Sequence, residues 1–331
     1  MADTDPLSQL RGRPGIIRLH GHRGARGVLP ENTLVSMRHA LDCRLNAVEF
    51  DVRFSRDAVP VVTHDARLSP DIARGPDGRW LDAPGPAVNS LPLREIRQYR
   101  VGELRPGSAY AARFCDQAMV PETAIPTLDE VAALLAGDDR RGVWLNLEIK
   151  WDPHQDPDAL PPERAIGAIL DVLGARAMLG RTLIQSFDWR LLQELARQAP
   201  EVARSALSAL PRPALGRPGN VFPASPLLAG FSPDDFAGSL PRMVQATGAA
   251  VWSPRHSDLT DDDLTLAHEL GLIVNTWTVN AAKDIDRMIE LGVDGIITDY
   301  PGRAQQRLAA RSMSWRAGWP AAPQPEQRLG S

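Results

Sequence analysis

The sequence predicts an α/β protein of the (β/α)8 TIM-barrel type, with a small cap subdomain inserted after the second strand. Short apolar runs alternate along the chain with segments that show helical spacing, and this alternation is typical of a parallel sheet covered by helices. Counting the runs gives eight such units. The 331 residues, 43% of them hydrophobic, can bury a large core, and their number fits one large barrel or two ordinary domains.

The first half of the chain contains two of the eight strands and a long irregular stretch. Its predicted elements are a strand at 16–22, a helix at 30–43, a strand at 47–54, a hairpin arm at 60–65 and a helix at 125–136. Asn32 or Thr33 is the expected N-cap of the first helix, and Thr127 with Glu130 predicts a capping box on the second. The turn-rich residues 66–125 between them are typical of a lid or an inserted subdomain.

Strands and helices alternate regularly in the second half. Predicted strands lie at 142–150, 181–187, 203–208, 250–253, 272–279 and 295–301, and predicted helices at 162–173, 189–198, 234–248, 260–271 and 282–292, with one more at the end. The barrel is expected to span 15–311. Residues 1–14 are predicted to form a flexible arm and 312–331 a disordered tail.

Two acids of one strand are the centre of the predicted site. Glu49 and Asp51 alternate with apolar residues in VEFDV, so both carboxylates point to one face of the strand. Two such charges about 4 Å apart repel by roughly 4 kcal/mol at an effective dielectric of 20. Glu148, followed by Lys150 on the same strand face, supplies a third acid. Three carboxylates suit a hard divalent cation, Mg²⁺ or Ca²⁺, better than zinc.

Motifs spread over most of the chain resemble the glycerophosphodiester phosphodiesterase family. They occur in the family's order: HRG (22–24), PENT (30–33), VEFDV (48–52), VPVVTHD (59–65), IPTLDEV (125–131), LEIK (147–150), QSFDWR (185–190), TWTVN (276–280) and GVDGIITDYP (292–301). Each motif alone is weakly specific, whereas the ordered set is highly specific.

The resemblance implies a TIM barrel with an inserted cap and a site built from eight residues. In this reading Glu49, Asp51 and Glu148 hold one Mg²⁺ or Ca²⁺, and Arg23 and Lys150 contact the substrate phosphate. It further implies that His22 and His64 are the acid/base pair and that Glu31 has a supporting role. Trp277, at a predicted strand end, is expected to line the mouth of the site against the glycerol or alcohol part of the substrate.

The implied reaction is metal-dependent hydrolysis of glycerophosphodiesters to sn-glycerol 3-phosphate and an alcohol. An ordinary histidine pKa near 6.5 allows one histidine to act as base and the other as acid near neutral pH. The residues leave open which histidine is which, whether water or the glycerol hydroxyl attacks, and which cation is used. The alternatives are a phospholipase D-like activity on lysolipids and a noncatalytic ligand-binding barrel.

Composition excludes other classes of partner. The net charge of −4 argues against a nucleic-acid partner held by broad electrostatics. The apolar runs are too short to cross a bilayer, and the first residues do not form a secretory signal. Cys43 and Cys115 show neither metal nor redox spacing. A cytoplasmic enzyme that acts on a small glycerophosphodiester, without stable membrane association, is therefore expected, and its oligomeric state is left open.

Overall fold

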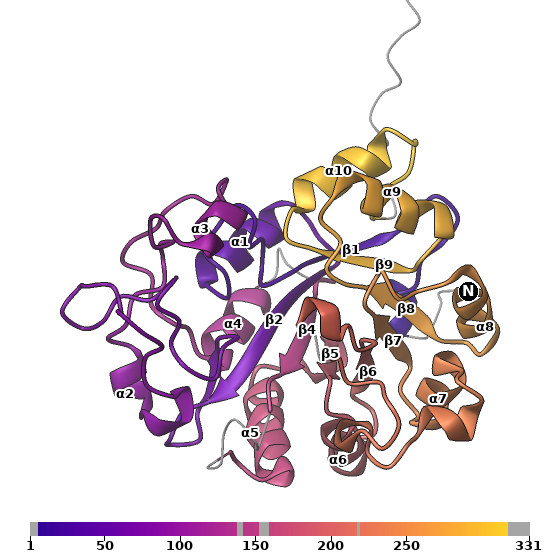
Figure 1. Cartoon of the computed structure of the whole chain (residues 1–331), viewed down its shortest axis with the longest axis horizontal. Helices are drawn as coiled ribbons and strands as arrows, with labels where there is room; N and C mark the ends of the chain where they lie inside the picture. The colour runs from indigo at the N-terminus through magenta and orange to yellow at the C-terminus, as the bar shows by residue number, and fades with distance from the viewer. Residues whose placement is uncertain (1–5, 138–141, 152–158, 217–218, 317–331) are drawn as a thin grey trace, which may run out of the picture.

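A closed barrel of parallel strands forms the centre of the structure, a computed structural model that describes residues 6–137, 142–151, 159–216 and 219–316. Nine strands are joined in the order β1-β9-β8-β7-β6-β5-β4-β2-β3, and β1 also pairs with β2, which closes the barrel. All pairings are parallel except that of β3 with β2. Helices pack around the outside (Figure 1). The predicted eight-stranded TIM barrel is confirmed.

The elements follow the predicted alternation. The parallel strands are β1 (Arg18–Gly21), β2 (Ala47–Phe54), β4 (Trp144–Ile149), β5 (Thr182–Ser186), β6 (Ala203–Ser208), β7 (Val251–Pro254), β8 (Ile273–Thr276) and β9 (Gly295–Thr298). The helices of the barrel are α1 (Leu34–Asp42), α4 (Leu128–Leu135), α5 (Pro162–Ala175), α6 (Trp189–Gln198), α7 (Leu240–Ala246), α8 (Asp261–Glu269), α9 (Ala282–Leu291) and α10 (Pro301–Ala309).

Helix starts depend on the side chains available to bind free N–H groups. Thr33 is the N-cap of α1 and accepts a hydrogen bond from Ser36 N, while Thr127 and Glu130 form the predicted capping box of α4. The helix predicted over 234–248 is shorter. It begins at Leu240, because Pro241 suits the first turn of a helix and the preceding 3-10 turn, Pro233–Phe236, ends in two left-handed residues, Ala237 and Gly238, at φ +50° and +80°.

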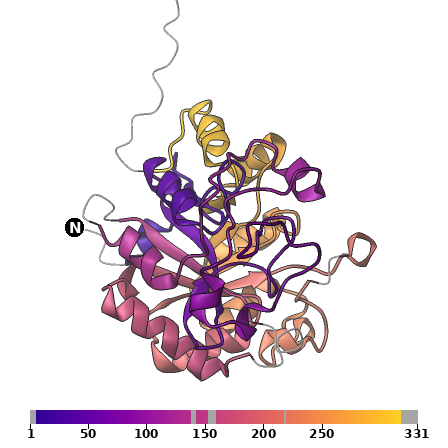
Figure 2. The same cartoon turned by 90° about the vertical axis from the view of Figure 1, so that its left-hand side faces the viewer.

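The irregular stretch after the second strand packs around a small core of its own. The antiparallel strand β3 (Pro60–Val62) leads into it, and it contains the short helices α2 (Leu93–Ile96) and α3 (Ala109–Arg113). Its buried apolar residues are Val61, Leu68, Ala73, Val88, Ile96, Val101 and Ile125. The segment lies beside β2 in Figure 1 and in front of the barrel in Figure 2. We call residues 66–125 the insertion.

The N-terminal residues cover the end of the barrel at which the strands begin. Residues 1–14 were expected to form a flexible arm, but the described part, from 6 onward, is packed. Leu10 is fully buried against the first residues of several strands, among them Trp144 and Leu183. Burying a leucine is worth about 1.5–3 kcal/mol, which fixes this segment; residues 1–5 lie outside the described residues.

The C-terminal residues return to the same region. Ile17 N donates a hydrogen bond to Ser314 O, and Trp315 is 7% exposed, so the described part of the expected tail, up to 316, is ordered against the barrel. Residues 317–331 lie outside the described residues. Among the helices that the structure describes, none is both long and apolar enough to cross a bilayer.

Candidate active site

Three carboxylates from neighbouring strands meet inside the barrel. Glu49 and Asp51 point inward from β2, and the register of the two strands places Glu148 of β4 beside Asp51. One oxygen of each lies within 4.8 Å of the others, and the residues are 1%, 0% and 6% exposed, respectively. The predicted convergence of acids that are distant in sequence is confirmed.

The three acids titrate differently because their neighbours differ. Burial, and then the charges of Asp51 and Glu148, raise the pKa of Glu49 well above its usual range. Burial would also raise the pKa of Asp51, but Lys150 and Arg23 hold it well below its ordinary value. Burial raises the pKa of Glu148 against the opposing charge of Lys150. A further positive charge would therefore stabilise the cluster.

The donor atoms of the cluster suit a divalent cation. Lys150 Nζ lies 2.5 Å from Glu148 Oε1 and 3.3 Å from Asp51 Oδ1. This ammonium group therefore already offsets part of the negative charge of the three acids. Asp51 Oδ1 is buried, and its contact with Lys150 is an ion pair without hydrogen-bond geometry. Buried carboxylate oxygens with spare acceptor capacity are the ligands that Mg²⁺ and Ca²⁺ prefer.

The loop after β1 directs Arg23 toward the acids. Arg23 adopts a positive φ of +51°, and its backbone N donates to Glu49 Oε2 at 2.8 Å. Its guanidinium lies 2.6 Å from Glu31 Oε1 and 3.1 Å from Asp51 Oδ2. Gly24 has φ +83°, and a Cβ there would lie 2.7 Å from the carbonyl carbon of Ser36. The HRG motif therefore needs glycine at its third position, and Glu31 lies where it can orient Arg23.

His22 is held by a carboxylate at the end of β9. His22 Nδ1 lies 2.6 Å from Asp299 Oδ1, and Nε2 lies 3.8 Å from Glu49 Oε2. Asp299 also accepts hydrogen bonds from Arg26 Nε and Nη2, at 2.9 and 3.0 Å, and from Asn280 Nδ2 at 2.6 Å. This arrangement fixes the ring with Nδ1 toward Asp299 and directs Nε2 into the cavity.

His64 lies at the other side of the acids, after β3. Its Nδ1 is 2.6 Å from Asp65 Oδ1, and 34% of its side chain is exposed. Desolvation, followed by the charges of Lys150 and Arg23, lowers the pKa of His64 to about 4. Burial lowers the pKa of His22 to about 4 against the opposing charge of Asp299. Both imidazoles are therefore more weakly basic than the ordinary value near 6.5 that the sequence suggested.

These side chains line one cavity of about 240 Å³, which we call the inner cavity. Its walls also include Trp277 and Phe187, whose rings meet edge to face at 5.2 Å. Trp277 Nε1 donates to Ser253 O at 2.8 Å, which fixes the indole. Except for Asp51 and Glu31, all the site residues expected from the sequence line this cavity, and those two contact residues that do.

Sequence reasoning did not assign several residues that the structure brings to the site. Asn32 binds Asp51 twice, Gln185 Nε2 donates to Glu49 Oε1 at 3.3 Å, and Arg113 of the insertion lines the inner cavity. The only sequence signal for Asp299 is its place near the end of the strand predicted at 295–301. Asn32 had a usable signal, since it lies within PENT, whereas Arg113 lies in a stretch without regular pattern.

Asp299 should make folding sensitive to acid. Burial alone would raise its pKa, but His22 and Arg26 hold the pKa of Asp299 below its ordinary value. Its contribution to stability is therefore present above the unfolded pKa of about 3.9 and is lost as pH falls below it. As pH falls from about 5 to about 3, the free energy of unfolding should decrease in both proteins. The decrease should be smaller in Asp299→Asn than in the wild type, and the difference should be roughly 1 kcal/mol.

Urea unfolding followed by circular dichroism at several pH values measures this difference. The matched control is Asp262→Asn, on the exposed first turn of α8. If the free energies of unfolding of the wild type and Asp299→Asn change in parallel with pH, the ionised Asp299 side chain does not contribute this stability.

Comparison with known proteins gives a consistent result. The model of the glycerophosphoryl diester phosphodiesterase family matches residues 22–303. A Silicibacter pomeroyi protein assigned as a glycerophosphoryl diester phosphodiesterase has a crystal structure that is 40% identical, with a TM-score of 0.85 over 94% of this chain and 99% of that one. A glycerophosphodiester phosphodiesterase from Bacillus altitudinis is 25% identical over 87% of this chain and 96% of its own. An Oleispira antarctica phosphodiesterase, solved with its product sn-glycerol-3-phosphate, shares the fold at 23% identity and TM-score 0.64, over 88% and 97% of the two chains.

Proposed function

The chain belongs to the glycerophosphoryl diester phosphodiesterase family, and from that membership we propose that it hydrolyses glycerophosphodiesters to sn-glycerol 3-phosphate and an alcohol. The Oleispira antarctica phosphodiesterase, bound to this product, supports the choice of product. We further propose that the reaction requires one divalent cation, Mg²⁺ or Ca²⁺, and uses His22 and His64 for proton transfer.

One observation carries the proposal: two carboxylate-supported histidines and two of the three clustered acids, Glu49 and Glu148, line a single small cavity, with Asp51 beside them. A purely structural cluster of this kind would be costly, because each buried charge loses its hydration. Here the acids instead face a cavity that a phosphate could enter. Arg23 and Lys150 line the same cavity, where they would contact the phosphate oxygens.

Glu49, Asp51 and Glu148 would hold the cation. A bound cation would supply positive charge that stabilises the negative charge developing on the phosphate in the transition state. Arg23 adds a fixed charge from the protein, since Glu31 and Asp51 hold its guanidinium in place. This preorganisation costs no rearrangement during the reaction.

The two histidines divide the proton transfers. One accepts a proton from the attacking hydroxyl, and the other donates a proton to the leaving alkoxide, which is otherwise a poor leaving group. Each has a carboxylate at Nδ1, Asp299 for His22 and Asp65 for His64, both at 2.6 Å. A carboxylate in this position orients the ring and stabilises the imidazolium form.

Chelation is the direct test of the cation requirement. Purified protein that has been treated with EDTA and then freed of it should lose essentially all hydrolysis of glycerophosphoglycerol, because the acid cluster would lack its neutralising charge. Addition of Mg²⁺ or Ca²⁺ should restore release of glycerol 3-phosphate, measured with a coupled dehydrogenase. Activity unchanged by the chelator would overturn the proposed cation.

Two further expectations stay proposals. The lysolipid alternative needs a wide apolar approach, and the acyl chain of lysophosphatidylcholine should make it a poorer substrate than glycerophosphocholine.

A cytoplasmic location, without stable membrane association, agrees with Cys43 and Cys115, which are both free thiols.

A further inference from the structure

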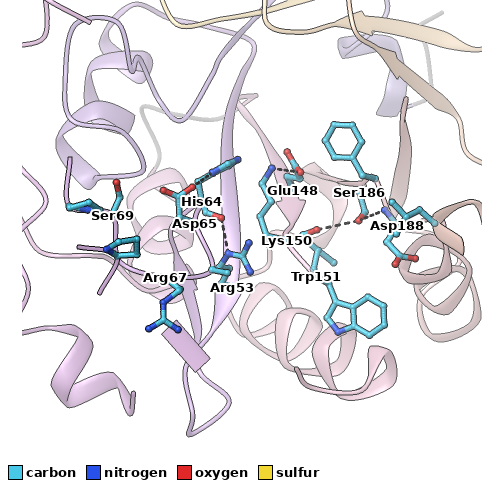
Figure 3. A pocket seen from close by; sticks show the side chains of 16 residues that line it. Arg53, His64, Asp65, Arg67, Ser69, Glu148, Lys150, Trp151, Ser186 and Asp188 are labelled. Atoms are coloured by element: carbon cyan, nitrogen blue, oxygen red, sulfur yellow. Dashed lines mark hydrogen bonds and ion pairs between the residues drawn. The ribbon is translucent and has the colours of Figure 1, made fainter. Parts of the chain in front are cut away.

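A second, larger cavity adjoins the inner one. It measures about 580 Å³, and we call it the outer cavity. The two cavities share His64, Glu148, Lys150 and Phe187 as lining residues, so they meet at the candidate catalytic groups. Figure 3 shows its two walls: Arg53, His64, Asp65, Arg67 and Ser69 on one side, and Lys150, Trp151, Ser186 and Asp188 on the other.

The sizes of the two cavities suggest how a diester would be divided between them. The inner cavity, at about 240 Å³, has to accommodate the phosphate and can add little more than the three-carbon glycerol. The outer cavity is large enough for a bulkier and variable alcohol, and the insertion contributes part of its wall through Arg67 and Ser69. This assignment rests on the proposed function. It makes the outer cavity the place where the head group is selected.

The carboxylates of the outer cavity already have positively charged or hydrogen-bonding partners. Both Asp188 oxygens bind Arg190, at 2.9 and 2.5 Å. Glu148 faces Lys150 at 2.5 Å, and Asp65 accepts from His64. Asp188 and Glu148 are thereby paired with cations of the protein and attract a cationic head group less, whereas Asp65, 51% exposed on its side chain, has a histidine as its partner.

The two aromatic rings that line the outer cavity also have protein cations beside them. The Arg190 guanidinium lies 5.0 Å from the ring centre of Trp151, and Lys150 Nζ lies 5.7 Å from that of Phe187. A quaternary ammonium group is normally recognised by open aromatic faces. Each of these two rings therefore has a protein cation near one face, which leaves less aromatic surface in the outer cavity for a choline-like alcohol.

Arg67 stands apart from the other charged groups of this wall. Its backbone pairs with Ala87, but its side chain makes no hydrogen bond or ion pair within the described residues. It is exposed at the mouth of the outer cavity, on the insertion. A guanidinium without a protein partner is suited to bidentate binding of a phosphate or carboxylate.

We propose that the outer cavity binds the alcohol part of the substrate and selects alcohols that carry a negative charge, a phosphomonoester or a carboxylate, with Arg67 as the residue that determines this preference. The proposal is supported by the Arg67 guanidinium, which has no partner within the described residues. It is also supported by the protein cations that already lie beside two carboxylates and two aromatic rings of this cavity. Arg67 would act on binding of the head group and not on the reacting phosphate.

The test uses two substrates that differ by one phosphate, glycerophosphoinositol 4-phosphate and glycerophosphoinositol. The wild type should show a ratio of kcat/KM of about 10 in favour of the phosphorylated substrate, the effect of one charge-assisted contact. Arg67→Gln should bring the ratio close to one, and Arg67→Lys should keep part of it. Raised ionic strength should lower the wild-type ratio, because the contact is partly exposed.

Arg79→Gln is the matched control, since Arg79 also lies on the insertion, with 88% of its side chain exposed and Asp77 as its neighbour. It should keep the wild-type ratio. A ratio near one in the wild type, or one that Arg67→Gln leaves unchanged, would overturn the inference while leaving the proposed function intact. No release of glycerol 3-phosphate from either substrate, or from glycerophosphocholine, would overturn the proposed function and this inference with it.

Discussion

Glu148→Gln is expected to reduce kcat by about 10³-fold or more, since it removes one of three negative charges from the candidate cation site. The side chain keeps its shape, so the packing of β4 against β2 should persist. Lys150, which lies 2.5 Å from Glu148 Oε1, would lose this ionic partner and keep its ion pair with Asp51, at 3.3 Å. A loss of this size corresponds to about 4 kcal/mol of transition-state stabilisation.

Metal binding and turnover separate the explanations for this loss. Calorimetric titration with Mg²⁺ and Ca²⁺ should show affinity weakened by 10- to 100-fold, roughly the effect expected when one ligand is impaired. Glu49→Gln should show the same losses of metal affinity and of turnover. Glu290→Gln, on the exposed face of α9 with 70% of its side chain exposed, is the control. Full activity of Glu148→Gln in the presence of a chelator would refute the assignment of these acids.

His22→Ala is expected to lower kcat by about 10³-fold while leaving metal affinity within a few-fold of the wild type. The fold should survive the change, because Arg26 and Asn280 continue to bind Asp299. His64→Ala should show the same pattern, since its partner Asp65 is 51% exposed on its side chain and can be hydrated. His39→Ala, on α1 outside the inner cavity, controls for nonspecific damage.

An aryl phosphodiester distinguishes the acid from the base. A nitrophenolate leaves without a proton, so the variant that has lost the acid should recover most of its rate on bis(p-nitrophenyl) phosphate, whereas the variant that has lost the base should not. Equal loss on both substrates for both variants would contradict a division of roles between His22 and His64.

The barrel and the acid cluster could be predicted because both follow from simple periodicities. Alternation within VEFDV places Glu49 and Asp51 on one face, and the repeated strand-helix pattern brings Glu148 to the neighbouring strand. The N-terminal segment was harder, since a polar stretch gives no sign that Leu10 will cover the barrel end. Contacts that close a barrel are nonlocal and leave no local pattern.

The basicity of the histidines could not be predicted for a related reason. A pKa depends on desolvation and on charges contributed by distant segments, here Lys150 and Arg23 beside His64. The roles of Asp299 and Asn280 depend on a pairing of the first and last strands that only the closed barrel creates. The insertion carries no periodicity, so Arg67, Tyr110 and Arg113 could not be placed in advance.

Tyr110 gives the insertion a further link to the site, besides the lining residues Arg67 and Arg113. Its hydroxyl donates to Glu31, the same residue that holds Arg23, and it lies 3.3 Å from Arg26. Chimeras that exchange residues 66–125 between relatives would therefore change two properties at once, substrate choice and the alignment of the arginine. A transplanted segment lacking a phenol at this position would leave one Glu31 oxygen without its donor, so engineered swaps need both sides of this contact from the same parent.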